Sequence, residues 1–90
     1  MNAPLAMIDH AVAVTRKHME VAATPQGRLR ALWAGVKHAR ALAAPGVVAQ
    51  AFNSLASEFS NELGKKAKED AAHVIAWAQR GVDPFGKGAK

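Results

Sequence analysis

The sequence contains no cysteine and no tyrosine, and it has only two tryptophans and three phenylalanines. The absence of cysteine excludes disulfide bonds and thiol chemistry, and it leaves the redox compartment open. The sequence also lacks a glycine-rich phosphate loop and a serine in a turn that would present a nucleophile. Its seven acidic residues mostly fall at positions expected on exposed helix faces, so no pair of carboxylates suggests acid–base catalysis. We therefore expect no enzymatic activity, no cofactor and no small-molecule substrate.

Long apolar runs are absent as well. No stretch approaches the roughly 20 apolar residues that cross a bilayer. The first residues lack the basic segment, apolar run and cleavage pattern of a signal peptide. We therefore expect a cytoplasmic protein without a membrane partner.

The histidines do not follow a metal-site pattern. His10 and His18 are eight residues apart, which is too far for an i, i+4 pair of ligands on one helix, and His38 and His73 fall in other segments. No carboxylate joins them at ligand spacing. We expect no metal site.

Alanine dominates what is present. Half of the 90 residues are hydrophobic, and 21 of these are alanine. Alanine is the best helix former, but it fills little core volume. A chain of this length corresponds to one domain and buries a modest fraction of its surface. The composition predicts helices that pack closely or that bury a face against a second molecule.

Hydrophobic spacing predicts an all-α fold, either a compact bundle or an array of about four short helices. The expected helices cover residues 4–22, 25–43, 47–63 and 65–80. Residues 1–85 would form a single helical domain, and residues 86–90 would form a basic flexible tail.

Caps and breaks support these boundaries. Asn2 is a candidate cap of the first helix, and Thr24-Pro25 reads as a cap followed by a first helical residue. The break Ala44-Pro45-Gly46 separates the second and third helices. Gly64 and Gly81 suit the left-handed conformation that ends a helix, and Phe85 is expected to fold back onto the domain.

Each expected helix has an apolar stripe at helical spacing. Gly35 interrupts the second stripe, and a close helix crossing at this position would explain a glycine there. The four stripes are Leu5, Ile8, Val12, Thr15 and Met19; Leu29, Leu32, Trp33, Val36, Ala39 and Ala43; Val48, Ala51, Phe52, Leu55, Phe59 and Leu63; and Ala67, Ala71, Val74, Ile75 and Ala78.

The positive charge is concentrated in the second helix. The formal net charge is +5, and residues 25–43 contribute Arg28, Arg30, Lys37 and Arg40 without an acidic residue. Arg30 and Lys37 project at nearly the same angle, with Arg40 nearby. This pattern is typical of a stripe that follows phosphates. It is also typical of the ordinary solvated face of a helical bundle.

The fourth helix carries a second candidate patch. His73, Trp77 and Arg80 have i, i+4, i+7 spacing and lie away from the predicted stripe. A tryptophan among basic groups resembles an interface hot spot, and it would also stack on an unpaired base. The alternative is that Trp77 flanks the core and is covered by Phe85.

The first helix has a second apolar line at heptad spacing, formed by Met7, Val14 and Val21. This line indicates self-association or protein binding, although it is short for a coiled coil. The alternative is that the helix is sandwiched within the monomer.

Residues 39–55 invite comparison with a helix-turn-helix, because Gln50, Asn53, Ser54 and Ser57 would be exposed and able to read base edges. The segment that would read DNA has no lysine or arginine, however, and Glu58 and Glu62 make its distal half acidic. The sequence therefore does not favour this motif.

These features together predict a small non-enzymatic binding protein of a regulatory kind. Its expected target is nucleic acid or a complex that handles nucleic acid, since the charge is basic and concentrated. The alternative is a protein-binding adaptor, inhibitor or assembly subunit, including a homodimer.

Overall fold

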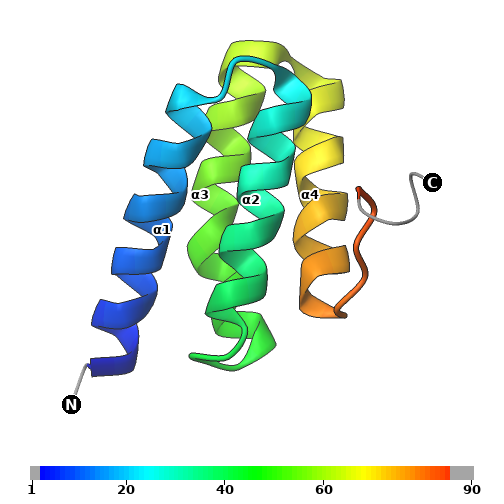
Figure 1. Cartoon of the computed structure of the whole chain (residues 1–90). Coiled ribbons are helices and arrows are strands. Elements are labelled where there is room, and N and C mark those ends of the chain that lie inside the picture. The colour runs from blue at the N-terminus through cyan, green and yellow to red at the C-terminus, as the bar shows by residue number, and fades with distance from the viewer. Residues whose placement is uncertain (1–2, 86–90) are drawn as a thin grey trace.

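Residues 3–85 form four α-helices joined by short connections (Figure 1). The computed structural model describes residues 3–85, and it describes the side chains of residues 6–58 and 64–85. No strand occurs within these residues, so the predicted all-α class is confirmed. The helices are α1 (Ala3–Val21), α2 (Pro25–Ala39), α3 (Pro45–Leu63) and α4 (Lys65–Gln79).

The helices α2 and α3 lie between α1 and α4. Both α1 and α4 contact α2 and α3, and Figure 1 shows α1 and α4 at opposite edges of the molecule. The most extensive pairings are α3 with α4, α1 with α2, and α2 with α4. All four helices therefore turn their apolar stripes toward one core. Within the described residues, no helix has the length and apolar character required to cross a membrane.

The core consists mainly of the predicted stripes. The side chains of Leu5, Phe59 and Leu63 lie outside the described set. Alanines such as Ala39, Ala71 and Ala78 are fully buried and allow the helices to approach closely. The largest fully buried side chains are Phe52, Ile8, Leu32, Leu55, Val36 and Val48.

Local capping chemistry sets several helix ends. Thr24 Oγ1 accepts a hydrogen bond from the backbone N–H of Gly27 at 3.0 Å, and Pro25 occupies the first helical position. Gly64 and Gly81 have φ angles of 96° and 77°, which residues with a side chain rarely adopt. These three predictions are confirmed, whereas the predicted cap Asn2 lies outside the described residues.

Two predicted boundaries were wrong. The helix α2 ends at Ala39 rather than at residue 43, because the chain tightens there: the N–H of Leu42 bonds to the carbonyl of Ala39 at 2.8 Å, three residues back. Ala43 therefore lies in the connection and is only half-buried. The helix α3 begins at Pro45 rather than at residue 47, since proline suits a first helical position where no N–H partner is needed.

The helices α1 and α2 cross very closely at Thr15 and Gly35. The Thr15 side chain is 3% exposed, and its hydroxyl donates a hydrogen bond to the Ala11 carbonyl at 2.7 Å. A Cβ atom on Gly35 would overlap Thr15 Oγ1 and would lie 2.8 Å from Thr15 Cγ2. The predicted close crossing at Gly35 is therefore confirmed, and the glycine is required by space rather than by backbone conformation.

We expect Gly35→Ala to destabilise the protein although alanine is the better helix former. The added methyl group overpacks the crossing at a cost of about 1–3 kcal/mol, which opposes a propensity gain of about 1 kcal/mol. The free energy of unfolding, measured by denaturant titration, should fall relative to the wild type.

Gly46→Ala provides the matched control. Gly46 also lies in a helix, but an added Cβ would meet nothing within 4 Å. This variant should be as stable as the wild type or more stable. An equal gain in stability for Gly35→Ala and Gly46→Ala would show that the crossing has room for a methyl group.

Candidate functional site

The outer side of α2 carries an exposed basic face, which we define as Arg30, Lys37 and Arg40. All three side chains are exposed, whereas the fourth predicted cation, Arg28, is half-buried. Neither of the ion pairs Arg16–Glu58 and Lys66–Asp70 includes one of these three cations. The face therefore presents three positive charges, and Arg28 stands apart from it.

The C-terminal segment 81–85, which we call the strap, folds back onto α2. Gly81 closes α4, and the Val82 N–H bonds to the Trp77 carbonyl at 2.8 Å, which redirects the chain. The Trp33 Nε1–H then donates to the Val82 carbonyl at 2.7 Å. Phe85 packs edge-on against Trp33, with ring centroids 6.3 Å apart. The predicted return of Phe85 onto the domain is confirmed, and its ring packs on Trp33.

The strap and the basic face form one surface. The Arg30 guanidinium lies 5.1 Å from the centroid of the Phe85 ring, and Lys37 Nζ lies 4.9 Å from that of Trp33. The Arg40 guanidinium lies beside Gly81, where an added Cβ would come within 3.0 Å of Nη1. Aromatic faces attract cations electrostatically, so the two rings hold Arg30 and Lys37 in place while leaving them exposed.

The patch predicted on α4 is partly assembled. His73 stacks on Trp77 with ring centroids 5.6 Å apart and an interplanar angle of 23°. Trp77 is half-buried and packs against the core, while His73 and Arg80 are exposed. The indole therefore combines a structural contact with an accessible edge. Trp77 therefore flanks the core as one alternative expected, but the expected cover by Phe85 was wrong, because Phe85 packs on Trp33.

One turn earlier on α4, Lys66 Nζ and Asp70 Oδ1 form an ion pair at 2.9 Å. The hydrogen bond that Lys66 donates to Asp70, followed by the charge of this carboxylate, raises the pKa of Lys66 above its ordinary value. Lys66 and Asp70 neutralise one another, so neither adds an unpaired charge to the patch of His73, Trp77 and Arg80.

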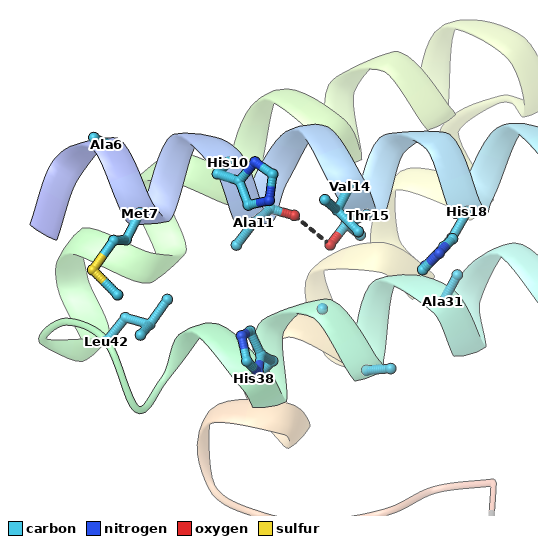
Figure 2. A pocket seen from close by; sticks show the side chains of 12 residues that line it. Ala6, Met7, His10, Ala11, Val14, Thr15, His18, Ala31, His38 and Leu42 are labelled. Atoms are coloured by element: carbon cyan, nitrogen blue, oxygen red, sulfur yellow. Dashed lines mark hydrogen bonds between the residues drawn. The ribbon is translucent and has the colours of Figure 1, made fainter. Parts of the chain in front are cut away.

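An apolar groove of about 580 Å³ lies between α1 and α2 (Figure 2). Small residues such as Ala11 and Gly35 are part of its lining. The imidazoles of His10, His18 and His38 also line it. Sequence spacing alone did not bring these histidines together, because His38 belongs to a different helix. Among the described residues, no three histidine or acidic side chains are arranged to hold a metal ion.

Two of the residues in the predicted apolar line of α1, Met7 and Val14, line this groove. Figure 2 shows Met7 pointing toward Leu42 at one end of the groove. Val21, at the last position of α1, is exposed. The line is therefore on the surface and is not sandwiched within the monomer.

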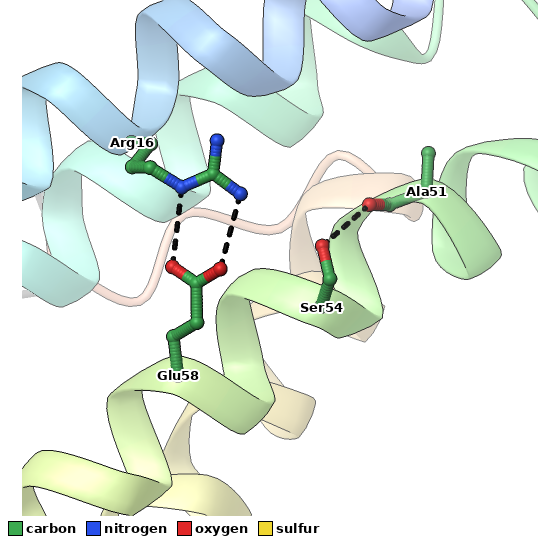
Figure 3. Close-up of polar contacts among 4 residues, drawn as sticks. All are labelled: Arg16, Ala51, Ser54 and Glu58. Atoms are coloured by element: carbon green, nitrogen blue, oxygen red, sulfur yellow. Dashed lines mark hydrogen bonds and ion pairs between the residues drawn. The ribbon is translucent and has the colours of Figure 1, made fainter.

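A salt bridge that the sequence analysis missed joins α1 to α3 (Figure 3). Arg16 Nε and Nη2 donate to the two carboxylate oxygens of Glu58, each at 3.1 Å. These hydrogen bonds raise the pKa of Arg16 above its ordinary value. Both side chains are more than one-third exposed, so the pair contributes at most about 1 kcal/mol. Glu58 is thus occupied by an intramolecular partner.

The polar residues compared with a recognition helix are on the surface of α3. Gln50, Asn53, Ser54 and Ser57 are all exposed. Ser54 Oγ donates a long hydrogen bond of 3.4 Å to the Ala51 carbonyl (Figure 3). Residues 45–63 contain no lysine or arginine to hold a phosphate backbone, so this surface does not support a helix-turn-helix interpretation.

The fold and these surfaces define a small four-helix protein that exposes a basic face and an apolar groove. Comparisons with protein-family models, with curated proteins and with solved structures found no match to this chain.

We expect Phe85→Ala to loosen the strap over Trp33. The measurement uses a Trp77→Phe background, in which Trp33 is the single tryptophan. Loss of the aromatic pair removes about 0.5–1.5 kcal/mol, so acrylamide should quench the Trp33 fluorescence more strongly. Phe85→Leu, which keeps an apolar side chain, should cause a smaller increase. Identical quenching in all three proteins would mean that Phe85 does not shield the indole.

Proposed function

We propose that this protein is a non-enzymatic binding protein whose basic face on α2 contacts the phosphate backbone of nucleic acid. The proposal depends on the grouping of Arg30, Lys37 and Arg40 around the strap. All three side chains are exposed, and none of them belongs to the Arg16–Glu58 or the Lys66–Asp70 ion pair. Neutralisation of phosphates by such cations releases counterions, and this release drives binding regardless of sequence.

The spacing of the cations supports this proposal. Arg30 and Lys37 are seven residues apart on one helix, which is about 10 Å along its axis. Successive phosphates on one DNA strand are about 3.4 Å apart along the duplex axis. On a duplex whose axis runs parallel to α2, the two side chains are therefore separated by about three phosphate steps.

The strap supports the proposal in a second way. Long cationic side chains lose conformational freedom when they bind, and this loss weakens association. Because Phe85 and Trp33 already restrain Arg30 and Lys37, a smaller loss remains on binding. The sequence after the strap adds Lys87 and Lys90 to the positive charge of the chain.

We expect the triple variant Arg30→Ala, Lys37→Ala, Arg40→Ala to bind nucleic acid more weakly and with a flatter salt dependence. The slope of log K against log salt concentration should decrease by about one unit for each lost phosphate contact, and so by up to about three units. Fluorescence anisotropy with labelled double-stranded and single-stranded DNA, at several salt concentrations, measures this slope.

The matched control is the triple variant Lys65→Ala, Lys66→Ala, Lys68→Ala, which removes the same charge from exposed positions on α4. This variant should retain most of the wild-type salt slope. Equal loss in both triple variants would indicate that net charge alone is responsible. Absence of binding at low salt would overturn the proposal.

A second candidate function is the binding of a protein partner through α4, and the stacked His73–Trp77 pair favours it. An aromatic group held by a neighbouring ring, with Arg80 three residues further along the chain, has the composition of an interface hot spot. The same DNA titration separates the two functions. Lack of binding to both forms of DNA would leave protein binding as the better-supported function.

A further inference from the structure

Three tryptophan or phenylalanine side chains remain partly exposed, and each of them contacts a basic side chain. Among the described residues, Phe52 is the one phenylalanine or tryptophan that is fully buried in the core. The partly exposed rings and their basic partners are Trp33 with Lys37, Phe85 with Arg30, and Trp77 with His73. A flat ring beside a basic group offers both contacts that a nucleotide of a single strand makes, one to its base and one to its phosphate.

The strap brings these three pairs together. The Val82 N–H donates to the Trp77 carbonyl at 2.8 Å, and the Val82 carbonyl accepts a hydrogen bond from Trp33 Nε1 at 2.7 Å. Phe85 is itself part of the strap. The Arg40 guanidinium lies beside Gly81, so the basic face of α2 reaches the end of α4. The basic face and the aromatic residues of α4 are therefore parts of one surface around the strap.

The pair of His73 and Trp77 differs from the other two pairs in its geometry. Its ring planes are 23° apart and its centroids are 5.6 Å apart, so one face of the imidazole is turned toward the indole. His73 is exposed, and the opposite face of its ring is thus available. Trp33 and Phe85 instead meet edge-on at 81°. A planar base can therefore extend the stack of His73 and Trp77 by one further ring.

We infer that His73 and Trp77 form a stacking platform for an unpaired nucleobase, so that the nucleic acid held by the basic face is single-stranded. This inference rests on the proposed function, because the cations of α2 would hold phosphates of the same strand. The bases of a duplex are stacked on one another and have no free ring face to offer. An unpaired base has a free ring face, and stacking on it tolerates any base sequence.

Arg80 connects the platform to the basic face. It is exposed, it lies three residues beyond Trp77, and it directly precedes Gly81, beside which the Arg40 guanidinium lies. Its positive charge is therefore available to a phosphate of a strand that runs from the platform to α2.

The first test compares three ligands of equal length with the full chain: oligothymidine, an abasic strand that has the phosphates without the bases, and a duplex. Fluorescence anisotropy at one low salt concentration gives the affinities. Oligothymidine should bind about tenfold more tightly than the abasic strand, as expected for one stacked base, and more tightly than the duplex. Equal affinity for oligothymidine and the abasic strand, or tighter binding of the duplex, would overturn the platform and leave the phosphate contact in place. Absence of binding to all three ligands would overturn both.

Substitution of His73 separates stacking from charge. His73→Ala should weaken oligothymidine binding about tenfold without changing the affinity for the abasic strand. His73→Phe, which keeps a flat ring and removes the basic group, should retain the wild-type affinity. His18→Ala, at an exposed histidine of α1, is the control and should bind as the wild type does. Circular dichroism establishes that the variants fold. Equal loss in His73→Ala and His73→Phe would overturn the platform.

Chemical protection locates the base on the wild-type protein. Diethyl pyrocarbonate acylates accessible imidazoles, and mass spectrometry measures the reaction at each histidine. Oligothymidine should protect His73 more strongly than the abasic strand does. His10 and His18, which are also exposed, should react equally with and without the strand and serve as internal controls. Unchanged reactivity of His73 in the presence of saturating oligothymidine would overturn the inference.

Discussion

The contact between Thr15 and Gly35 determines how the rest of the structure is arranged. A helix crossing without a Cβ atom on one side brings α1 and α2 closer than ordinary side chains permit. Thr15 is the one buried polar residue among those described, and it satisfies its hydroxyl on its own helix through the Ala11 carbonyl. Nothing polar is then left unpaired at the crossing. The position of α2 in turn sets the surface on which the strap, the basic face and the groove are built.

Two sides of α2 serve two different surfaces. Trp33 and Lys37 belong to the side that receives the strap. Ala31, Ala34 and His38 belong to the side that lines the groove with α1. Because the surfaces are on separate sides of one helix, occupation of one does not require displacement of the other.

Trp33 has the largest role in organising the basic face. Its indole N–H anchors the strap through the Val82 carbonyl, its ring meets Phe85, and its face supports Lys37. Helical spacing predicted Trp33 in the buried stripe of its helix, and Trp33 is half-buried there. Helical spacing did not predict the contact between Trp33 and the strap, because Val82 lies 49 residues away. The same reason explains the missed Arg16–Glu58 pair, whose members are 42 residues apart.

The sequence by itself determined the number of helices, most of their ends and the identity of the core. These properties are local: apolar residues repeat at helical spacing, Thr24 caps its own helix, and Gly64 and Gly81 supply the left-handed turns. The end of α2 was misplaced because alanine continues a helix as readily as it borders a turn. Only the tertiary structure decided which surfaces these helices form together. The strap, the three histidines of the groove and the exposure of Val14 depend on how distant segments pack, and helical periodicity carries no information about which helices become neighbours.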